Sequence, residues 1–162
     1  MSAIGHGAIV IVGIGQPTAG DDGVGLLVAR TLARRGVPAL ESTDATVLLS
    51  FLGEGRSVVV VDAVVGDGDA GTVLRLRPEA LAEGPKPVSS HGLGVVEMLA
   101  LASALHGADV LRRVEIVGVL IDGAPRFGGA LSVAVAAAVV PAAALAERLA
   151  GRGCCSSRDV RR

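Results

Sequence analysis

The chain has 162 residues, a formal net charge of −1 at pH 7 and a mean hydropathy of +0.60. Apolar residues make up 51% and charged residues 19%, which is enough for one compact core and excludes a disordered chain. Aromatic residues are only 1%, and the 15 basic residues do not outnumber the 16 acidic ones, so we expect no nucleic-acid partner.

The first strand and helix are predicted at the N-terminal end. Residues 8–12 form a continuous, mostly β-branched apolar run between glycines, which is typical of a strand covered on both faces. After a loop over 15–20, apolar positions at helical spacing predict a helix over 23–35. Asp21 and Asp22 stand at its start, where an aspartate can cap the helix.

Three further elements complete the first half. They are a strand over 37–40, a short helix over 46–52 and a buried strand over 58–61 that ends on Asp62. Residues 72–77 alternate between apolar and polar, which predicts a half-exposed strand. The link from Asp62 is too short for a parallel crossover, so this strand is expected antiparallel to 58–61 or at a sheet edge.

The second half continues the alternation of strands and helices. A loop over 84–90 precedes a helix over 93–105, a strand over 114–120 and a helix over 131–149. Together these elements predict an α/β fold, a three-layer α/β/α sandwich around a mostly parallel five-stranded sheet with one antiparallel strand. We expect residues 1–150 to form a single domain and the basic segment 151–162 to be disordered.

Cysteine and hydropathy patterns indicate a cytoplasmic protein. Cys154 and Cys155 are adjacent, a spacing that does not suit a structural disulfide, and this usage fits a reducing compartment. Residues 1–7 lack the basic segment of a signal peptide. The longest apolar stretch, 130–146, is rich in alanine, so it predicts a core-facing helix and no membrane partner.

Three polar residues are candidates for chemistry. Asp22 follows the first strand, Asp62 ends a later strand, and His91 precedes a helix. If the strands are parallel, all three lie at the rim where ligands of α/β sheets bind. Two carboxylates and an imidazole suit a divalent transition metal with open coordination positions, and the same trio could perform acid–base chemistry without a metal.

A nucleotide-binding domain is an alternative. The loop after the first strand has Thr18 where a dinucleotide fingerprint needs glycine, and the carboxylates of Asp21 and Asp22 would repel a pyrophosphate. The sequence also lacks G-x-S-x-G and H-E-x-x-H motifs. Nucleotide binding would predict thermal stabilisation by added nucleotide.

Four segments, taken together, resemble one enzyme family. They are Gly13-Ile-Gly-Gln-Pro-x-x-Gly-Asp-Asp-Gly-Val-Gly25, Val-Val-Val-Val-Asp62-Ala-Val, Ser90-His91-Gly-Leu-Gly94 and Val117-Gly118-Val119. In this order, and over about Ala8 to Leu149, they look like the hydrogenase maturation proteases, the endopeptidases that trim the large subunit of nickel–iron hydrogenases.

The resemblance implies a phosphorylase/hydrolase-like fold and removal of a C-terminal extension from a hydrogenase large-subunit precursor once nickel is inserted. It maps the family's catalytic, nickel-contacting acid–acid–histidine trio onto Asp22, Asp62 and His91, and leaves Asp21 as the expected helix cap. The nickel is supplied by the substrate, and we expect the free protein to hold it only weakly. An alternative of a different class is a non-catalytic module that binds metal or precursor in the same pathway.

Two positions depart from the family pattern. Gln16 stands where the family usually has asparagine, and Ser42-Thr43-Asp44-Ala45 replaces a stretch that is often Gly-Thr-x-Gly. If the longer amide of Gln16 bonds a loop carbonyl, the loop must shift. The changed segment over 42–45 puts the choice of partner in question.

Overall fold

The computed structural model describes residues 9–82, 86–87, 94–123 and 128–153. Its helices and strands are β1 Ile9–Ile14, α1 Val24–Arg34, β2 Ala39–Ser42, α2 Val47–Gly53, β3 Ser57–Val65, β4 Val73–Leu76, β5 Lys86–Pro87, α3 Val95–His106, β6 Val114–Leu120 and α4 Val133–Gly153. Three short 3₁₀ turns accompany them, namely η1 Gly20–Gly23, η2 Pro78–Ala82 and η3 Ala108–Arg113.

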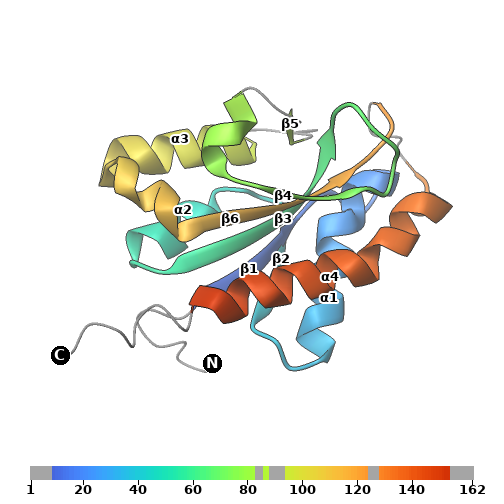
Figure 1. The fold of residues 1–162 in the computed structure, drawn as a ribbon, viewed down its shortest axis with the longest axis horizontal. Helices are drawn as coiled ribbons and strands as arrows, with labels where there is room; N and C mark the ends of the chain where they lie inside the picture. The colour runs from blue at the N-terminus through green and yellow to red at the C-terminus, as the bar shows by residue number, and fades with distance from the viewer. Residues whose placement is uncertain (1–8, 83–85, 88–93, 124–127, 154–162) are drawn as a thin grey trace.

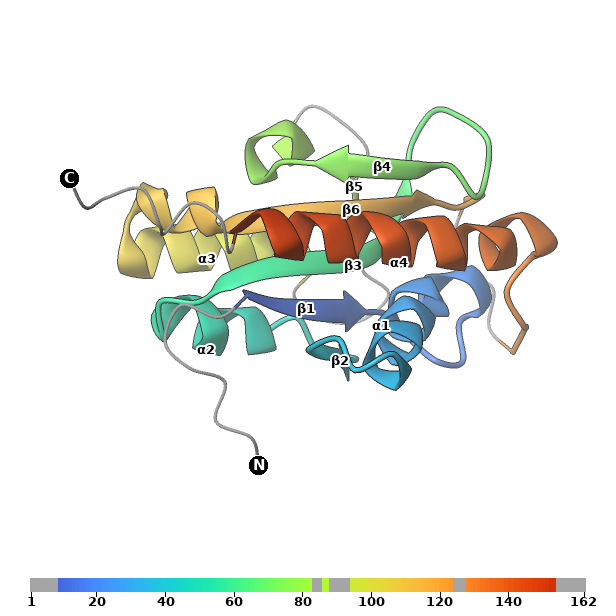
Figure 2. The ribbon, with the colours of Figure 1, turned by 60° about the horizontal axis from the view of Figure 1, so that its bottom comes forward.

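The strands form a mixed, mostly parallel sheet in the order β2-β1-β3-β6-β4 (Figure 2). The pairs β1–β2, β1–β3 and β3–β6 are parallel, whereas β4 runs antiparallel to β6. This arrangement confirms the predicted fold class. The two-residue strand β5, which was not predicted, pairs antiparallel with the end of β3.

The position of β4 corrects one of the two placements predicted for it. Residues 73–76 lie at the sheet edge, as expected, but their antiparallel partner is β6 and not the 58–61 segment of β3. The reason is that β3 already pairs with β1 on one side and with β6 on the other. The turn-rich segment between β3 and β4 therefore passes β6. Strand β4 then pairs with the edge of β6 that β3 leaves free.

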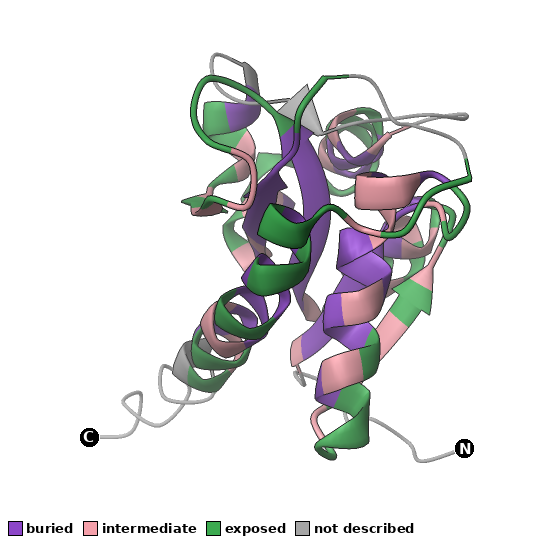
Figure 3. Cartoon of the chain, turned by 90° about the vertical axis from the view of Figure 1, so that its right-hand side faces the viewer, coloured by how far each residue is buried: buried purple, intermediate pink, exposed green. Residues whose placement is uncertain are grey.

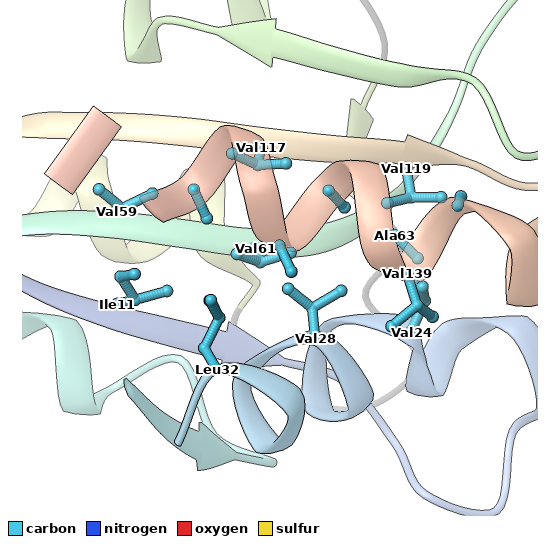
Figure 4. Close-up of a cluster of buried hydrophobic side chains, with 14 of the residues drawn as sticks. Ile11, Val24, Val28, Leu32, Val59, Val61, Ala63, Val117, Val119 and Val139 are labelled. Carbon is cyan, nitrogen blue, oxygen red and sulfur yellow. The ribbon is translucent and has the colours of Figure 1, made fainter. Parts of the chain in front are cut away.

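Helices α1 and α4 cover one face of the sheet (Figures 1 and 4). Odd-numbered strand residues such as Ile11, Val59 and Val61 point to this face, because successive side chains of a strand alternate between faces. They pack against Val24 and Val28 of α1 and against the apolar side of α4.

The opposite face is covered by α2 and α3. Val10, Val12, Val58 and Val60 point to it and pack against residues such as Leu48 of α2 and against the buried side of α3. The two clusters lie on opposite faces of one sheet and account for its continuous β-branched strand sequences. Figure 3 shows the buried strands between their covering helices.

Helix α4 is the predicted core-facing helix. By length and composition alone, Val133–Gly151 could cross a membrane. In the fold, however, Val135, Ala138, Ala142 and Ala146 are buried against the sheet. The helix extends beyond its predicted end at residue 149, to Gly153, so the first residues of the expected tail are helical. Residues 154–162 lie outside the described part of the chain.

Candidate functional site

The first site residue, Asp22, lies in the turn that follows β1. The side chain is 1% exposed, and its Oδ2 atom accepts a hydrogen bond of 3.1 Å from the backbone N–H of Gln16. A Cβ atom at Gly15 would lie 2.2 Å from the carbonyl oxygen of Asp22. Glycine is therefore required here for the loop to fold back tightly on η1 and place this carboxylate below the surface.

Two glycines bring α1 against the strands. A Cβ atom at Gly25 would lie 2.2 Å from the carbonyl oxygen of Ile14 and 2.5 Å from that of Val61, and one at Gly13 would lie 2.0 Å from the carbonyl oxygen of Gly25. These contacts are far shorter than the roughly 3.3 Å at which carbon and oxygen atoms meet in proteins. Helix α1 therefore approaches the backbone of β1 and β3 this closely only because both positions lack side chains.

The second site residue, Asp62, lies within β3, which continues beyond it to Val65, so the prediction that the strand ends on Asp62 is wrong. It is 2% exposed, and its Oδ1 atom accepts a hydrogen bond of 2.9 Å from the backbone N–H of Ala63. The residue has the same parity as Val58 and Val60, which places it on the sheet face covered by α2 and α3. In the sheet register its neighbour on β6 is Gly118.

The two aspartates influence each other. Burial raises the pKa of the Asp62 carboxyl well above its usual value, and the negative charge of Asp22 raises it further, whereas the bond from Ala63 opposes the change. This coupling and the packing of η1 against β3 show that two carboxyl groups 40 residues apart in sequence face a common region. A pair of this kind favours a proton or a metal cation between its members, because either relieves the repulsion of two buried charges.

The structure thus brings together two members of the predicted trio. His91, the third, lies outside the described residues, so its place in the site stays a prediction. Within the ranges that are described, no group of three or more His, Cys, Asp and Glu side chains has the arrangement of a metal site. The set of two carboxylates is chemically suited to a hard or borderline divalent cation and is incomplete for tight binding.

Asp21 has a different role from the one predicted. Neither η1 nor α1 has a side-chain hydrogen bond at its N-cap, so the expectation that Asp21 caps this helix is wrong. Instead, its Oδ1 atom accepts a hydrogen bond of 2.6 Å from the backbone N–H of Ser132, immediately before α4. Ser132 in turn accepts a hydrogen bond through Oγ from the N–H of Val135. The sequence carries no signal for this contact, since the two residues are 111 positions apart.

The two positions that depart from the family pattern, Gln16 and the 42–45 segment, are in contact. The side-chain amide of Gln16 donates a hydrogen bond of 3.3 Å to the backbone carbonyl of Thr43. The segment over 42–45 has its own local bonds, in which Asp44 accepts from the backbone of Thr46 through its carboxylate. The loop that carries Asp22 is therefore tied to the changed segment after β2 by the longer glutamine side chain.

Comparisons with known proteins identify the family of this chain. The family model described as hydrogenase maturation protease matches residues 41–149. The chain is 32% identical over 154 residues to the hydrogenase expression/formation protein HoxM of Azotobacter vinelandii, covering 90% of this chain and 73% of HoxM. It is 34% identical over 125 residues to the protein FrxA of Pyrococcus furiosus, covering 74% of this chain and 88% of FrxA.

A solved structure extends the comparison to the fold. The [NiFe] hydrogenase maturation protease HybD from Thermococcus kodakarensis superimposes with a TM-score of 0.71 at 29% identity, covering 88% of this chain and 99% of HybD. HycI from the same organism gives a TM-score of 0.62 at 26% identity, covering 91% and 93%. The family match and the HoxM relative establish the assignment, and the chain belongs to the hydrogenase maturation proteases, a family of endopeptidases.

Proposed function

We propose that this protein removes the C-terminal extension of a nickel–iron hydrogenase large-subunit precursor, in the cytoplasm, after nickel has been inserted into that precursor. The observation that supports this proposal most strongly is the pair of buried carboxyl groups, Asp22 in the turn after β1 and Asp62 in the carboxyl-terminal half of the neighbouring parallel strand β3. Ligands of open α/β sheets bind beyond the carboxyl ends of the strands, and both residues lie toward that side of the sheet. The similar proteins named above supply the substrate class.

The nickel of the precursor belongs to the substrate in this scheme. Asp22, Asp62 and His91 contact it from the protease side, where the two carboxylates gain a cation that offsets their mutual repulsion. Because the protease contributes only part of a coordination shell and no thiolate, it holds free nickel weakly. Cleavage therefore waits for a precursor that brings its own metal.

The bond is broken by water. A water molecule attacks the carbonyl carbon of the scissile peptide, the C–N bond breaks, and the proton lost by water reaches the leaving amine. A metal ion beside the carbonyl polarises it and acidifies the water, and a carboxylate of the pair accepts the proton from the water.

The experiment that tests the proposal compares nickel-loaded with nickel-free precursor. We expect a loss of mass, corresponding to the extension, for the nickel-loaded precursor alone. Equal cleavage of both forms would contradict metal gating. Binding of the precursor without any change in its mass would identify the non-catalytic binding module instead.

A further inference from the structure

A cavity of about 170 Å³ opens beside the turn that carries Asp22. One wall comes from η1 and α1 and is formed by Gly20, Gly23, Leu26 and Leu27, with Pro17 from the preceding loop. The opposite wall is the segment of Gly129, Ala130 and Leu131 that leads into α4. Gly20 and Gly23 flank Asp22 in sequence, so the cavity lies beside the turn that carries this aspartate, while the side chains of Asp22 and Asp62 are not part of its lining.

Two hydrogen bonds hold the walls together. The backbone N–H of Gly128 donates to the carbonyl of Thr18 at 2.7 Å, and the N–H of Ser132 donates to Asp21 Oδ1 at 2.6 Å. These bonds lie on either side of the 129–131 segment. The cavity is therefore built into the fold, and a ligand that enters it does not have to order that segment first.

The lining selects an apolar ligand. Among the described lining residues, Arg30 is the charged one, and Glu41 holds its guanidinium by two bonds of 3.0 and 2.6 Å. Because the guanidinium of Arg30 already donates these two hydrogen bonds to Glu41, it is not available to bind the carboxylate of a ligand. The other lining residues are leucine, alanine, proline and glycine, which offer apolar surface and backbone.

The volume suits a single large aliphatic side chain. An apolar cavity of about 150 Å³ is large enough to bind a benzene molecule. We propose that this cavity is a specificity pocket that binds a side chain of the size of leucine, isoleucine or methionine from the precursor, within two residues of the scissile bond. The inference rests on the proposed function, since it names the part of the substrate that enters beside Asp22.

The test measures kcat/KM for nickel-loaded precursors in which each of the two residues on either side of the cut is, in turn, leucine or alanine. We expect the wild-type protein to prefer leucine by at least about tenfold at one of these positions, because a missing methylene in an apolar pocket has an effect of this size. A wild-type protein without a preference at any of the four positions would overturn the pocket assignment. If none of the precursors is cleaved, both the proposed function and the pocket assignment are overturned.

Two variants link the preference to the cavity. Gly129→Leu adds a large side chain to a residue that lines the cavity, at a position where a Cβ atom meets nothing within 4 Å, and we expect the leucine preference to fall to about onefold to twofold. Gly151→Leu is the matched control at an equally open position far along α4, and it should keep the wild-type preference. An unchanged preference in Gly129→Leu would contradict the proposal.

Enlarging the cavity provides a second, independent readout. Leu27→Ala removes three carbon atoms from the wall, and we expect the ratio of kcat/KM for phenylalanine over leucine at the same precursor position to rise by about tenfold or more. Because it compares two substrates of one variant, this ratio is insensitive to the fraction of protein that folds. An unchanged ratio would place the preferred side chain elsewhere.

Discussion

Replacing Gly25 by alanine tests whether the close contact between α1 and the sheet positions Asp22. The new Cβ atom would lie 2.2 Å from the carbonyl oxygen of Ile14 and 2.5 Å from that of Val61. Both atoms belong to the backbone of central strands, so neither can rotate away. To restore a normal carbon–oxygen distance of roughly 3.3 Å, α1 must withdraw by about 1 Å.

The size of the effect follows from two opposing contributions. Overpacking of a core typically destabilises a protein by about 1–3 kcal/mol, and two backbone contacts place Gly25→Ala at the upper end of this range. Alanine in a helix regains about 1 kcal/mol over glycine. The net loss in the free energy of unfolding is about 2 kcal/mol, which in a chain of this size lowers Tm by about 4–8 °C.

The assay combines thermal unfolding with cleavage of nickel-loaded precursor. A displacement of about 1 Å at a catalytic group can reduce activity about a hundredfold, and we expect a loss of that order. Gly23→Ala is the control for stability, because its Cβ atom would come no closer than 3.2 Å to Gln16, and its Tm should stay near that of the wild type. If Gly25→Ala were as stable as Gly23→Ala and as active as the wild type, the close approach would not position Asp22.

Three further predictions concern the polar residues of the site. Because the pKa of Asp62 is raised in the folded protein, this carboxyl group holds its proton to a higher pH than in the unfolded chain, so its contribution lowers the stability as the pH rises from ~4 through the folded pKa. Asp62→Asn should remove this loss and raise the free energy of urea unfolding at pH 7, while abolishing cleavage; an unchanged pH dependence would refute the coupling. Asp21→Ala should lower Tm by about 2–4 °C through loss of about 1 kcal/mol from the bond to Ser132, and Asp21→Asn, which keeps an acceptor, should recover most of it; equal Tm values for both variants would show that the bond contributes nothing. Gln16→Ala should alter the relative kcat/KM values for different hydrogenase precursors, because it removes the hydrogen bond between the Asp22 loop and the 42–45 segment. An unchanged order of these values would show that this hydrogen bond does not influence substrate choice.

The sequence predicts the central strands better than it predicts the sheet edge. The runs around Val10 and Val59 are continuous and β-branched, so both strands could be located from the pattern alone, although β3 extends past its predicted end to Val65. The partner of β4 could not be predicted in this way. It depends on the other strand pairs of the sheet, because β3 is flanked by β1 and β6, and β4 therefore pairs with the free edge of β6. A two-residue strand such as β5 has no periodicity to detect.

The roles of single residues depended on tertiary contacts. An aspartate before a helix is commonly an N-cap, and the prediction for Asp21 followed that preference. The structure instead uses its carboxylate for the backbone of Ser132, a contact that local sequence does not encode. The cavity between η1 and the 129–131 segment was missed for the same reason, because its two walls come from opposite ends of the chain.

The proposed contact between the aspartate pair and the precursor's metal can be tested directly by nickel X-ray absorption. The nickel-loaded precursor is mixed with the protease, frozen before cleavage and compared with the free precursor. We predict that the wild-type protease adds oxygen ligands to the nickel and that the double variant Asp22→Asn, Asp62→Asn adds fewer. A nickel coordination shell that is the same with and without the wild-type protease, in a complex that goes on to cleave, would contradict the proposed role of the two carboxylates.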